Sequence, residues 1–199
     1  MLPDSIFTIQ TQDQFKNLAL ASFNYQWEHN TVYRRFCNYL KVDPATITEL
    51  DQIPFLPIQF FKEFKVVASE DAVQTVFTSS GTTGSITSKH HVTDLDLYEK
   101  SFRESFKLHY GAIENYTVLA LLPSYLERDG SSLIYMVDCL INDSKKPDSG
   151  FYLNDYNALS EKLKRLDAEG EKVLLIGVSF ALLDLVEQFE FKLKNTIVM

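Results

Sequence analysis

The 199-residue chain contains few of the residues that staple a small protein together: two cysteines, Cys37 and Cys139, and four histidines. The cysteines form no CxxC pair, so the sequence predicts neither a disulfide framework nor a zinc site. Both thiols are expected to be small buried side chains. The chain also lacks a Gly/Ser-rich linker and a repeat, and 45% of its residues are hydrophobic, which favours an ordinary globular protein.

Long apolar runs are missing as well. The longest, such as residues 118–123, fall far short of the about 20 residues that a membrane-spanning helix needs. The N-terminal residues 1–5 carry neither the basic nor the apolar segment of a signal peptide. We therefore expect a cytoplasmic protein without a membrane span.

Positive charge is in deficit. The net charge of -8 would repel a nucleic-acid backbone, and no basic patch offsets it, so nucleic acid is not an expected partner. A small nucleotide is not excluded, because backbone N–H groups of a loop can hold phosphates inside an acidic protein.

The first third of the chain is predicted to be helical. Thr11 and Asn30 are suited to cap two successive helices, and Asp43-Pro44 suits a further helix start. Residues 53–62 alternate prolines with bulky apolar side chains, which indicates an extended, packed connection. We assign residues 1–70 to a helical N-terminal region packed on the core.

From about residue 72, short apolar strands alternate with amphipathic helices. Strands are predicted at 73–78, 117–122 and 172–178, and helices at 94–110, 131–141, 158–168 and 180–189. This order favours a mostly parallel sheet with flanking helices, hence an α/β fold. Residues 71–199 are assigned to an α/β nucleotide-binding part. Residues 195–199 resemble the start of another strand with nothing after it, so we expect a fragment whose C-terminal part is absent.

The most informative segment lies between the first predicted strand and the helix after it. Five of its first seven residues carry hydroxyl groups, and the two glycines permit close backbone approach, in the order Thr78, Ser79, Ser80, Gly81, Thr82, Thr83, Gly84. The segment predicts a phosphate-holding loop, to which Lys89 adds positive charge. A solvated Ser/Thr/Gly turn is the alternative. No lysine follows Gly84 directly, so the segment is not a Walker A loop.

The hexapeptide from Ser79 to Gly84 resembles the phosphate loop of the adenylate-forming superfamily, which contains acyl-CoA synthetases, luciferases and peptide-synthetase adenylation domains. Two later segments are similar to further motifs of that superfamily. Residues 121–125 resemble its L-P-L-F-H turn, and residues 177–183 resemble the G-V-P-x-x-L segment beside the acyl pocket. The resemblance implies substrate-binding roles for Tyr125, Ser179 and Phe180; core packing, or helix capping by Ser179, is the alternative.

Within the superfamily, the N-terminal helices and the I-P-x-x-P-I-x-F-F-K segment at residues 53–62 are most similar to LuxE-type acyl-protein synthetases. Phenylacetate-CoA-ligase-like proteins are the near neighbours. The resemblance covers residues 50–199 and implies an incomplete N-domain of an adenylating enzyme. The family's ribose-binding acidic residue and acyl-accepting cysteine have no match in the chain.

The resemblance implies a ligase that converts a fatty or other carboxylic acid and ATP to acyl-AMP, and then passes the acyl group to a protein or CoA thiol. It implies that Thr83 and Lys89 are catalytic, that residues 78–84 and Lys89 bind ATP, and that Mg²⁺ bridges the phosphates without a protein metal site. His90 or His91 could supply the positive charge instead, although both are more readily explained as exposed loop residues. A non-catalytic ATP- or phosphate-binding fragment, a phenylacetate-CoA-ligase-like enzyme and a phosphotransferase remain as alternatives.

Overall fold

The computed structural model describes residues 3–68, 72–79, 87–122, 130–153 and 155–199. The chain divides into two compact units, Met1–Ser101 and Phe102–Met199, which we call the N-terminal and C-terminal units. The dividing point lies within helix α4 (Leu95–Tyr110). The predicted division into a helical region, residues 1–70, and an α/β part, residues 71–199, was based on the sequence pattern and stays a prediction.

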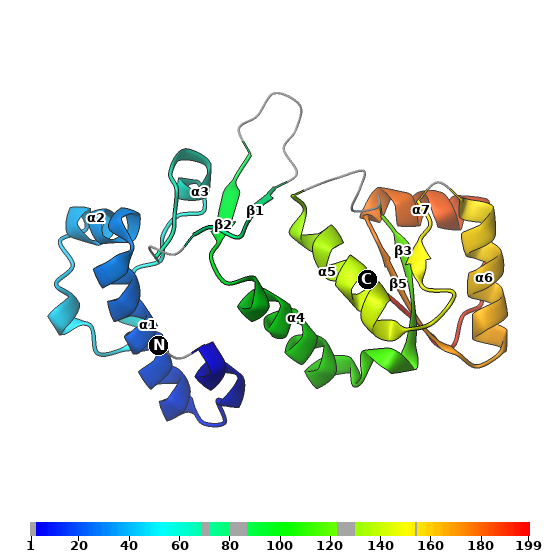
Figure 1. Cartoon of the computed structure of the whole chain (residues 1–199), viewed down its shortest axis with the longest axis horizontal. Coiled ribbons are helices and arrows are strands. Elements are labelled where there is room, and N and C mark those ends of the chain that lie inside the picture. The colour runs from blue at the N-terminus through cyan, green and yellow to red at the C-terminus, as the bar shows by residue number, and fades with distance from the viewer. Residues whose placement is uncertain (1–2, 69–71, 80–86, 123–129, 154) are drawn as a thin grey trace. The chain divides into compact units, whose positions relative to one another are not determined.

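The N-terminal unit begins with helices, as predicted (Figure 1). Its two long helices are α1 (Gln12–His29) and α2 (Thr31–Tyr39). Thr11 caps α1 in a reciprocal capping box with Gln14, and the Asn30 side chain accepts from the amide of Tyr33 at the start of α2. Both predicted caps are confirmed. Short helical turns follow at η2 (Pro44–Thr46), η3 (Leu50–Gln52) and α3 (Phe60–Glu63), after η1 (Pro3–Thr8) at the start.

The segment after α2 is packed as predicted, but it is not extended throughout. The Tyr33 hydroxyl donates to the Pro54 carbonyl at 2.6 Å, which ties the segment to α2. Further along, Phe60–Glu63 forms one helical turn, because no proline interrupts this stretch. The prediction of an extended chain up to Lys62 is therefore wrong at its end.

Phe23, Tyr33 and Cys37 form the buried core of the helical region. Burial raises the pKa of the Tyr33 phenol and that of the Cys37 thiol. Cys37 is fully buried, which confirms its prediction. Cys139 is only half-buried, so the same prediction was wrong for it.

The N-terminal unit also contains two antiparallel strands, β1 (Thr75–Thr78) and β2 (Lys89–Val92). The first strand was predicted; the second was not, since residues 89–92 had been assigned to the loop. β1 pairs with β2 rather than with any described strand of the parallel sheet. The helix predicted at 94–110 is confirmed as α4, and Gly111 ends it at a φ of 83° that favours glycine.

The C-terminal unit is the predicted α/β structure (Figure 1). Its four described strands are all parallel and lie in the order β4-β3-β5-β6. The strands are β3 (Tyr116–Leu121), β4 (Gly150–Phe151), β5 (Lys172–Gly177) and β6 (Thr196–Val198). The helices are α5 (Ser132–Ser144), α6 (Tyr156–Ala168) and α7 (Ser179–Gln188), with η4 (Ile113–Asn115) leading into β3.

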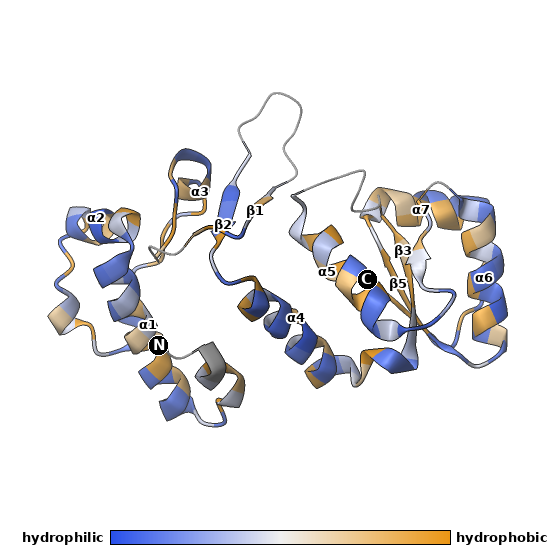
Figure 2. Ribbon diagram, in the orientation of Figure 1, coloured by the Kyte–Doolittle hydropathy of each residue, from blue (hydrophilic) through white to orange (hydrophobic). Residues whose placement is uncertain are grey.

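Helices cover both faces of this sheet, which explains why its central strands are mainly apolar (Figure 2). Val118 and Leu174 face the helix α5 side, where they pack with Val137. Leu119 and Leu175 face the other side and pack with residues of α6 and α7. All six residues of β3 are buried.

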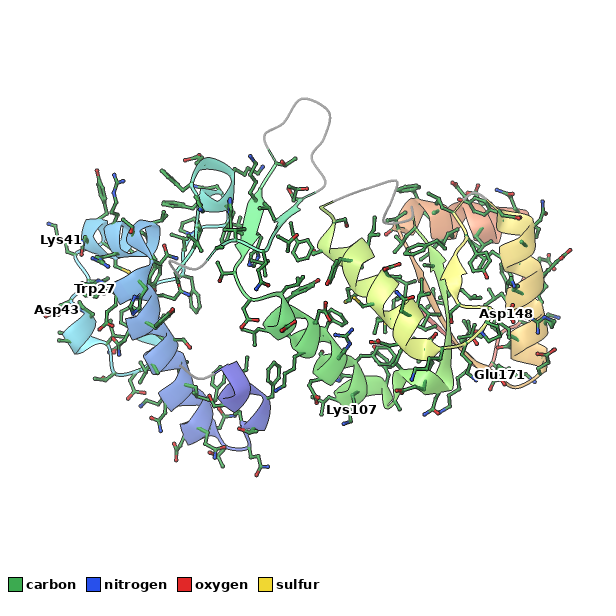
Figure 3. The ribbon with its side chains drawn as sticks, viewed as in Figure 1. Trp27, Lys41, Asp43, Lys107, Asp148 and Glu171 are labelled. Carbon is green, nitrogen blue, oxygen red and sulfur yellow. The ribbon has the colours of Figure 1, made fainter. Side chains whose placement is uncertain are left out.

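Salt bridges fix the outer face of α6 to the segment before β4. The Asp148 carboxylate accepts from both Lys162 and Arg165, and these hydrogen bonds lower its pKa (Figure 3).

Across the described ranges of the chain, no helix combines the length and apolarity needed to cross a bilayer.

Candidate functional site

The predicted phosphate loop lies between the two strands of the β1-β2 hairpin. The Ser79 amide donates to the Ser88 carbonyl, and the Ser88 amide donates to Ser79 Oγ, both at 3.1 Å. These reciprocal bonds join the chain on either side of the loop. Five of the predicted loop residues lie outside the described residues: Ser80, Gly81, Thr82, Thr83 and Gly84.

Two further predicted site residues start from opposite strands. Thr78 ends β1 and Lys89 begins β2, and their Cα atoms are paired across the ladder. Both side chains are exposed. Lys89 forms no ion pair with any other described residue, so its charge is available to an anionic ligand.

The sequence placed the loop between a strand and a helix, and the structure corrects this. The chain runs from β1 through the loop into β2, and only then into α4. The sequence of residues 89–92, Lys-His-His-Val, has one strongly apolar side chain, so no alternating pattern marks it as a strand. The segment forms a strand because its backbone pairs with β1, and this pairing could not be predicted from residues 89–92 alone.

His90 and His91 therefore belong to a strand, and the prediction of exposed loop residues is wrong for His91. Its Nδ1 is buried and has no hydrogen-bond partner among the described residues. Burial lowers the pKa of the imidazole, and the positive charges of Lys65, Lys89 and His90 lower it further. His90 is exposed and stacks near Phe61, with ring centroids 6.0 Å apart.

Of the three predicted substrate-binding residues, the structure describes two. Tyr125 lies outside the described residues, whereas Ser179 and Phe180 begin α7 directly after β5. Ser179 is the first helical residue and does not cap the helix through its side chain. Phe180 is 67% exposed, so the alternative of a core role is wrong for it. Their role in binding a substrate stays a prediction.

Gly177, at the end of β5, permits the close approach of the Leu182 side chain from α7. A Cβ atom built there would lie 2.8 Å from Leu182 Cγ and 3.2 Å from Leu121 Cβ. The helix thus begins immediately beyond the carboxyl end of a parallel strand, which is where α/β proteins commonly bind ligands.

A protein-held metal centre is not evident in the described ranges, where no three His, Cys, Asp or Glu side chains converge. Mg²⁺ commonly binds through substrate phosphates with few protein ligands. The hydroxyl and amine groups around the hairpin suit phosphate oxygens rather than a bare cation.

Together these features define an α/β protein with a hydroxyl-rich segment in a hairpin that precedes its parallel sheet. Comparison with known proteins shows which family the first half of the chain is similar to. Residues 5–101 match the family model described as "Acyl-protein synthetase, LuxE". The predicted resemblance to LuxE-type acyl-protein synthetases is confirmed for residues 5–101. This segment includes the N-terminal helices, which the predicted range of 50–199 had left out, and the resemblance of residues 102–199 stays a prediction.

Two curated relatives carry the same name, long-chain-fatty-acid–luciferin-component ligase. The protein of Photorhabdus luminescens is 41% identical over 70 residues, which are 35% of this chain and 60% of the relative. That of Vibrio harveyi is 34% identical over 80 residues, or 39% of this chain and 21% of the relative. The chain thus spans less than two thirds of the length of each of these relatives. No solved structure matches it significantly.

Proposed function

We propose that the protein takes part in the ATP-dependent activation of a fatty or other carboxylic acid, with the hydroxyl-rich loop of the β1-β2 hairpin holding the phosphates. The observation that carries this proposal is the position of the hexapeptide Ser79 to Gly84 inside the segment similar to acyl-protein synthetases. The names of the relatives, which are ligases of long-chain fatty acids, supply the substrate class.

The chemistry proceeds in two balanced steps. A carboxylate oxygen of the acid attacks the α-phosphorus of ATP, the bond to the β-phosphate oxygen breaks, and pyrophosphate leaves behind an acyl-adenylate. A thiolate of a protein cysteine or of CoA then attacks the acyl carbon, and AMP leaves. The first step places additional charge on the departing pyrophosphate, so donors fixed at that position lower its barrier.

The residues of this chain fit that task by the type of their donors. Ser79 and Ser88 join the chain on the two sides of the loop by reciprocal hydrogen bonds. Thr83 and Lys89 are proposed to stabilise the negative charge of the leaving pyrophosphate. Residues 78–84 are proposed to hold the nucleotide. Mg²⁺ would neutralise part of the phosphate charge, and the phosphates of the nucleotide would supply most of its ligands.

Replacement of Thr82 and Thr83 together by alanine tests the loop. Each net hydrogen bond to a charged group is worth about 1.5–3 kcal/mol, so ATP affinity should fall at least about tenfold. Isothermal titration calorimetry with Mg-ATP measures this, and Thr31→Ala, an exposed threonine on α2, is the matched control. Unchanged affinity in the double variant would remove the loop from the nucleotide site.

The reaction itself is tested by carboxylate-dependent exchange of labelled pyrophosphate into ATP. Exchange that requires a fatty acid, with AMP as the product in the presence of a thiol, supports adenylation. ATP binding without exchange for any acid contradicts the enzymatic proposal and leaves a nucleotide-binding module. Formation of ADP instead of AMP would identify a phosphotransferase.

A further inference from the structure

The N-terminal unit contains a cavity of about 990 Å³, and among the predicted site residues that the structure describes, His90 and His91 line it. All of its lining residues belong to this unit, and we call it the N-terminal cavity. Volumes of about 300–1,000 Å³ are typical of pockets that enclose small organic ligands. Its size alone therefore permits a ligand larger than a metal ion or a lone phosphate.

The walls of the N-terminal cavity are mainly apolar. α1 contributes Ala19 and Phe23, α2 contributes Tyr33, and the start of α4 contributes Leu97. Among its described lining residues Asp94 has the one carboxylate, and that group accepts from the Leu97 amide at 2.9 Å, at the start of α4. A lining of this kind favours a ligand that is aliphatic over most of its length.

One wall differs from the rest, because β2 brings two imidazole side chains to it, those of His90 and His91. His91 lines the cavity, and its buried Nδ1 has no hydrogen-bond partner among the described residues. A buried polar atom without a partner costs free energy unless a ligand or water satisfies it. Lys65 and Lys89 act on His91 as positive charges, and neither is paired with an acid in the part of the chain that the structure describes.

β2 also connects this wall to the predicted phosphate loop. Lys89 is the first residue of the strand after the loop, and His91 follows two residues later. Strands rise about 3.3 Å per residue, so the two positions are about 7 Å apart along β2. A carboxylate near His91 would therefore lie close to the strand end from which the phosphate loop departs.

We propose that the N-terminal cavity binds an aliphatic carboxylic acid, with the alkyl chain among the side chains of α1 and α4 and the carboxylate at His91. The proposal rests on the proposed function for its link to ATP, but the binding itself needs no nucleotide. It differs from the sequence prediction, which placed the acid beside Tyr125, Ser179 and Phe180 in the C-terminal unit.

The proposed binding of the alkyl chain is tested by filling the cavity with a larger side chain. Ala19→Trp should weaken binding of hexadecanoate at least about tenfold, since the indole occupies the space of several methylene groups. Equilibrium dialysis below the micellar concentration, without ATP, measures the affinity. Asn24→Trp, on the exposed part of α1 outside the cavity lining, is the matched control and should bind as the wild type does. Ser22→Phe, on the lining, replaces Ala19→Trp if circular dichroism shows that the latter does not fold.

The head-group part is tested by comparing hexadecanoate with hexadecan-1-ol, which has the same chain and no charge. The wild type should prefer the acid about tenfold or more, because a carboxylate hydrogen bond is stronger than a neutral one. His91→Phe keeps a ring but removes Nδ1, and should abolish the preference. His109→Phe, an exposed histidine of α4, should retain it.

The outcomes separate this proposal from the proposed function. Undiminished binding of hexadecanoate by both Ala19→Trp and Ser22→Phe overturns the cavity site, even if the wild type exchanges pyrophosphate with this acid. An equal affinity for acid and alcohol in the wild type overturns the assignment of the head group to His91. Binding that follows the expected pattern, without any exchange, supports the cavity and contradicts the proposed function.

Discussion

At the scale of single residues, Asn30 serves two helices at once. Its backbone amide donates to the Gln26 carbonyl at 2.8 Å and ends α1. Its side-chain oxygen accepts from the Tyr33 amide at 3.1 Å and starts α2. The side chain also donates to the Gln26 side chain, and the residue is 3% exposed. Removal of this side chain therefore leaves buried polar groups without partners.

Asn30→Ala should lower the free energy of unfolding of the N-terminal unit by about 1–2 kcal/mol, the usual effect of losing an N-cap at a buried position. Trp27, the single tryptophan of the chain, lies on α1 and reports the transition by its fluorescence in urea (Figure 3). Asn24→Ala, at an exposed position of α1, should change it by less than about 0.5 kcal/mol. Equal stability of the two variants would exclude the capping role.

At the scale of elements, the last turn of α6 fixes the start of β6. The Asp167 carboxylate accepts from the Lys194 amide at 2.9 Å, from the Asn195 amide at 2.7 Å and from Thr196 Oγ1 at 3.2 Å. The hydrogen bond from Asn195 is the main reason why the pKa of Asp167 lies below its ordinary value. The three-residue strand β6 is thus held by hydrogen bonds to Asp167 as well as by its backbone hydrogen bonds to β5.

This carboxylate links the stability of β6 to pH. Because the pKa of Asp167 is lowered on folding, its contribution is fully present above the ordinary aspartate value of about 3.9 and is lost as pH falls through the lowered value. Asp167→Asn should therefore be less stable than the wild type at neutral pH, and the difference should shrink in acid. Urea denaturation between pH 2 and 7 measures this. Asp184→Asn, an exposed residue of α7, is the control, and a constant difference across this range would contradict the linkage.

At the scale of the whole molecule, each compact unit contains a core of its own. Leu163 of α6 is fully buried against the parallel sheet in the C-terminal unit, whereas Trp27 packs at the core of the N-terminal unit. The two probes are therefore separate: far-ultraviolet circular dichroism reports both units, and tryptophan fluorescence reports only the first.

Leu163→Ala should destabilise the C-terminal unit by about 2–5 kcal/mol, the usual cost of truncating a buried leucine. The circular dichroism transition should move to lower urea for this unit, while the Trp27 fluorescence transition stays in place. Leu183→Ala, 60% exposed on α7, is the control and should move neither. An equal shift of both signals would show that the units unfold as one.

Much of the fold could be predicted because its signals are local. Thr11, Asn30 and Gly111 mark helix ends through hydrogen bonds and dihedral angles that involve only neighbouring residues. The strands β3 and β5 each contain a run of apolar residues, as is typical of strands covered on both faces. β4 was missed because two residues, Gly150 and Phe151, are too few for any pattern.

The sequence by itself determined the helix ends, the buried strands and the chemistry available in the loop, since these depend on residue types and near neighbours. Only the tertiary structure decided that β1 pairs with β2, that His91 faces a cavity and that Phe180 is exposed. Each of these depends on contacts between residues far apart in the chain, and a segment such as residues 89–92 contains no local pattern that specifies them.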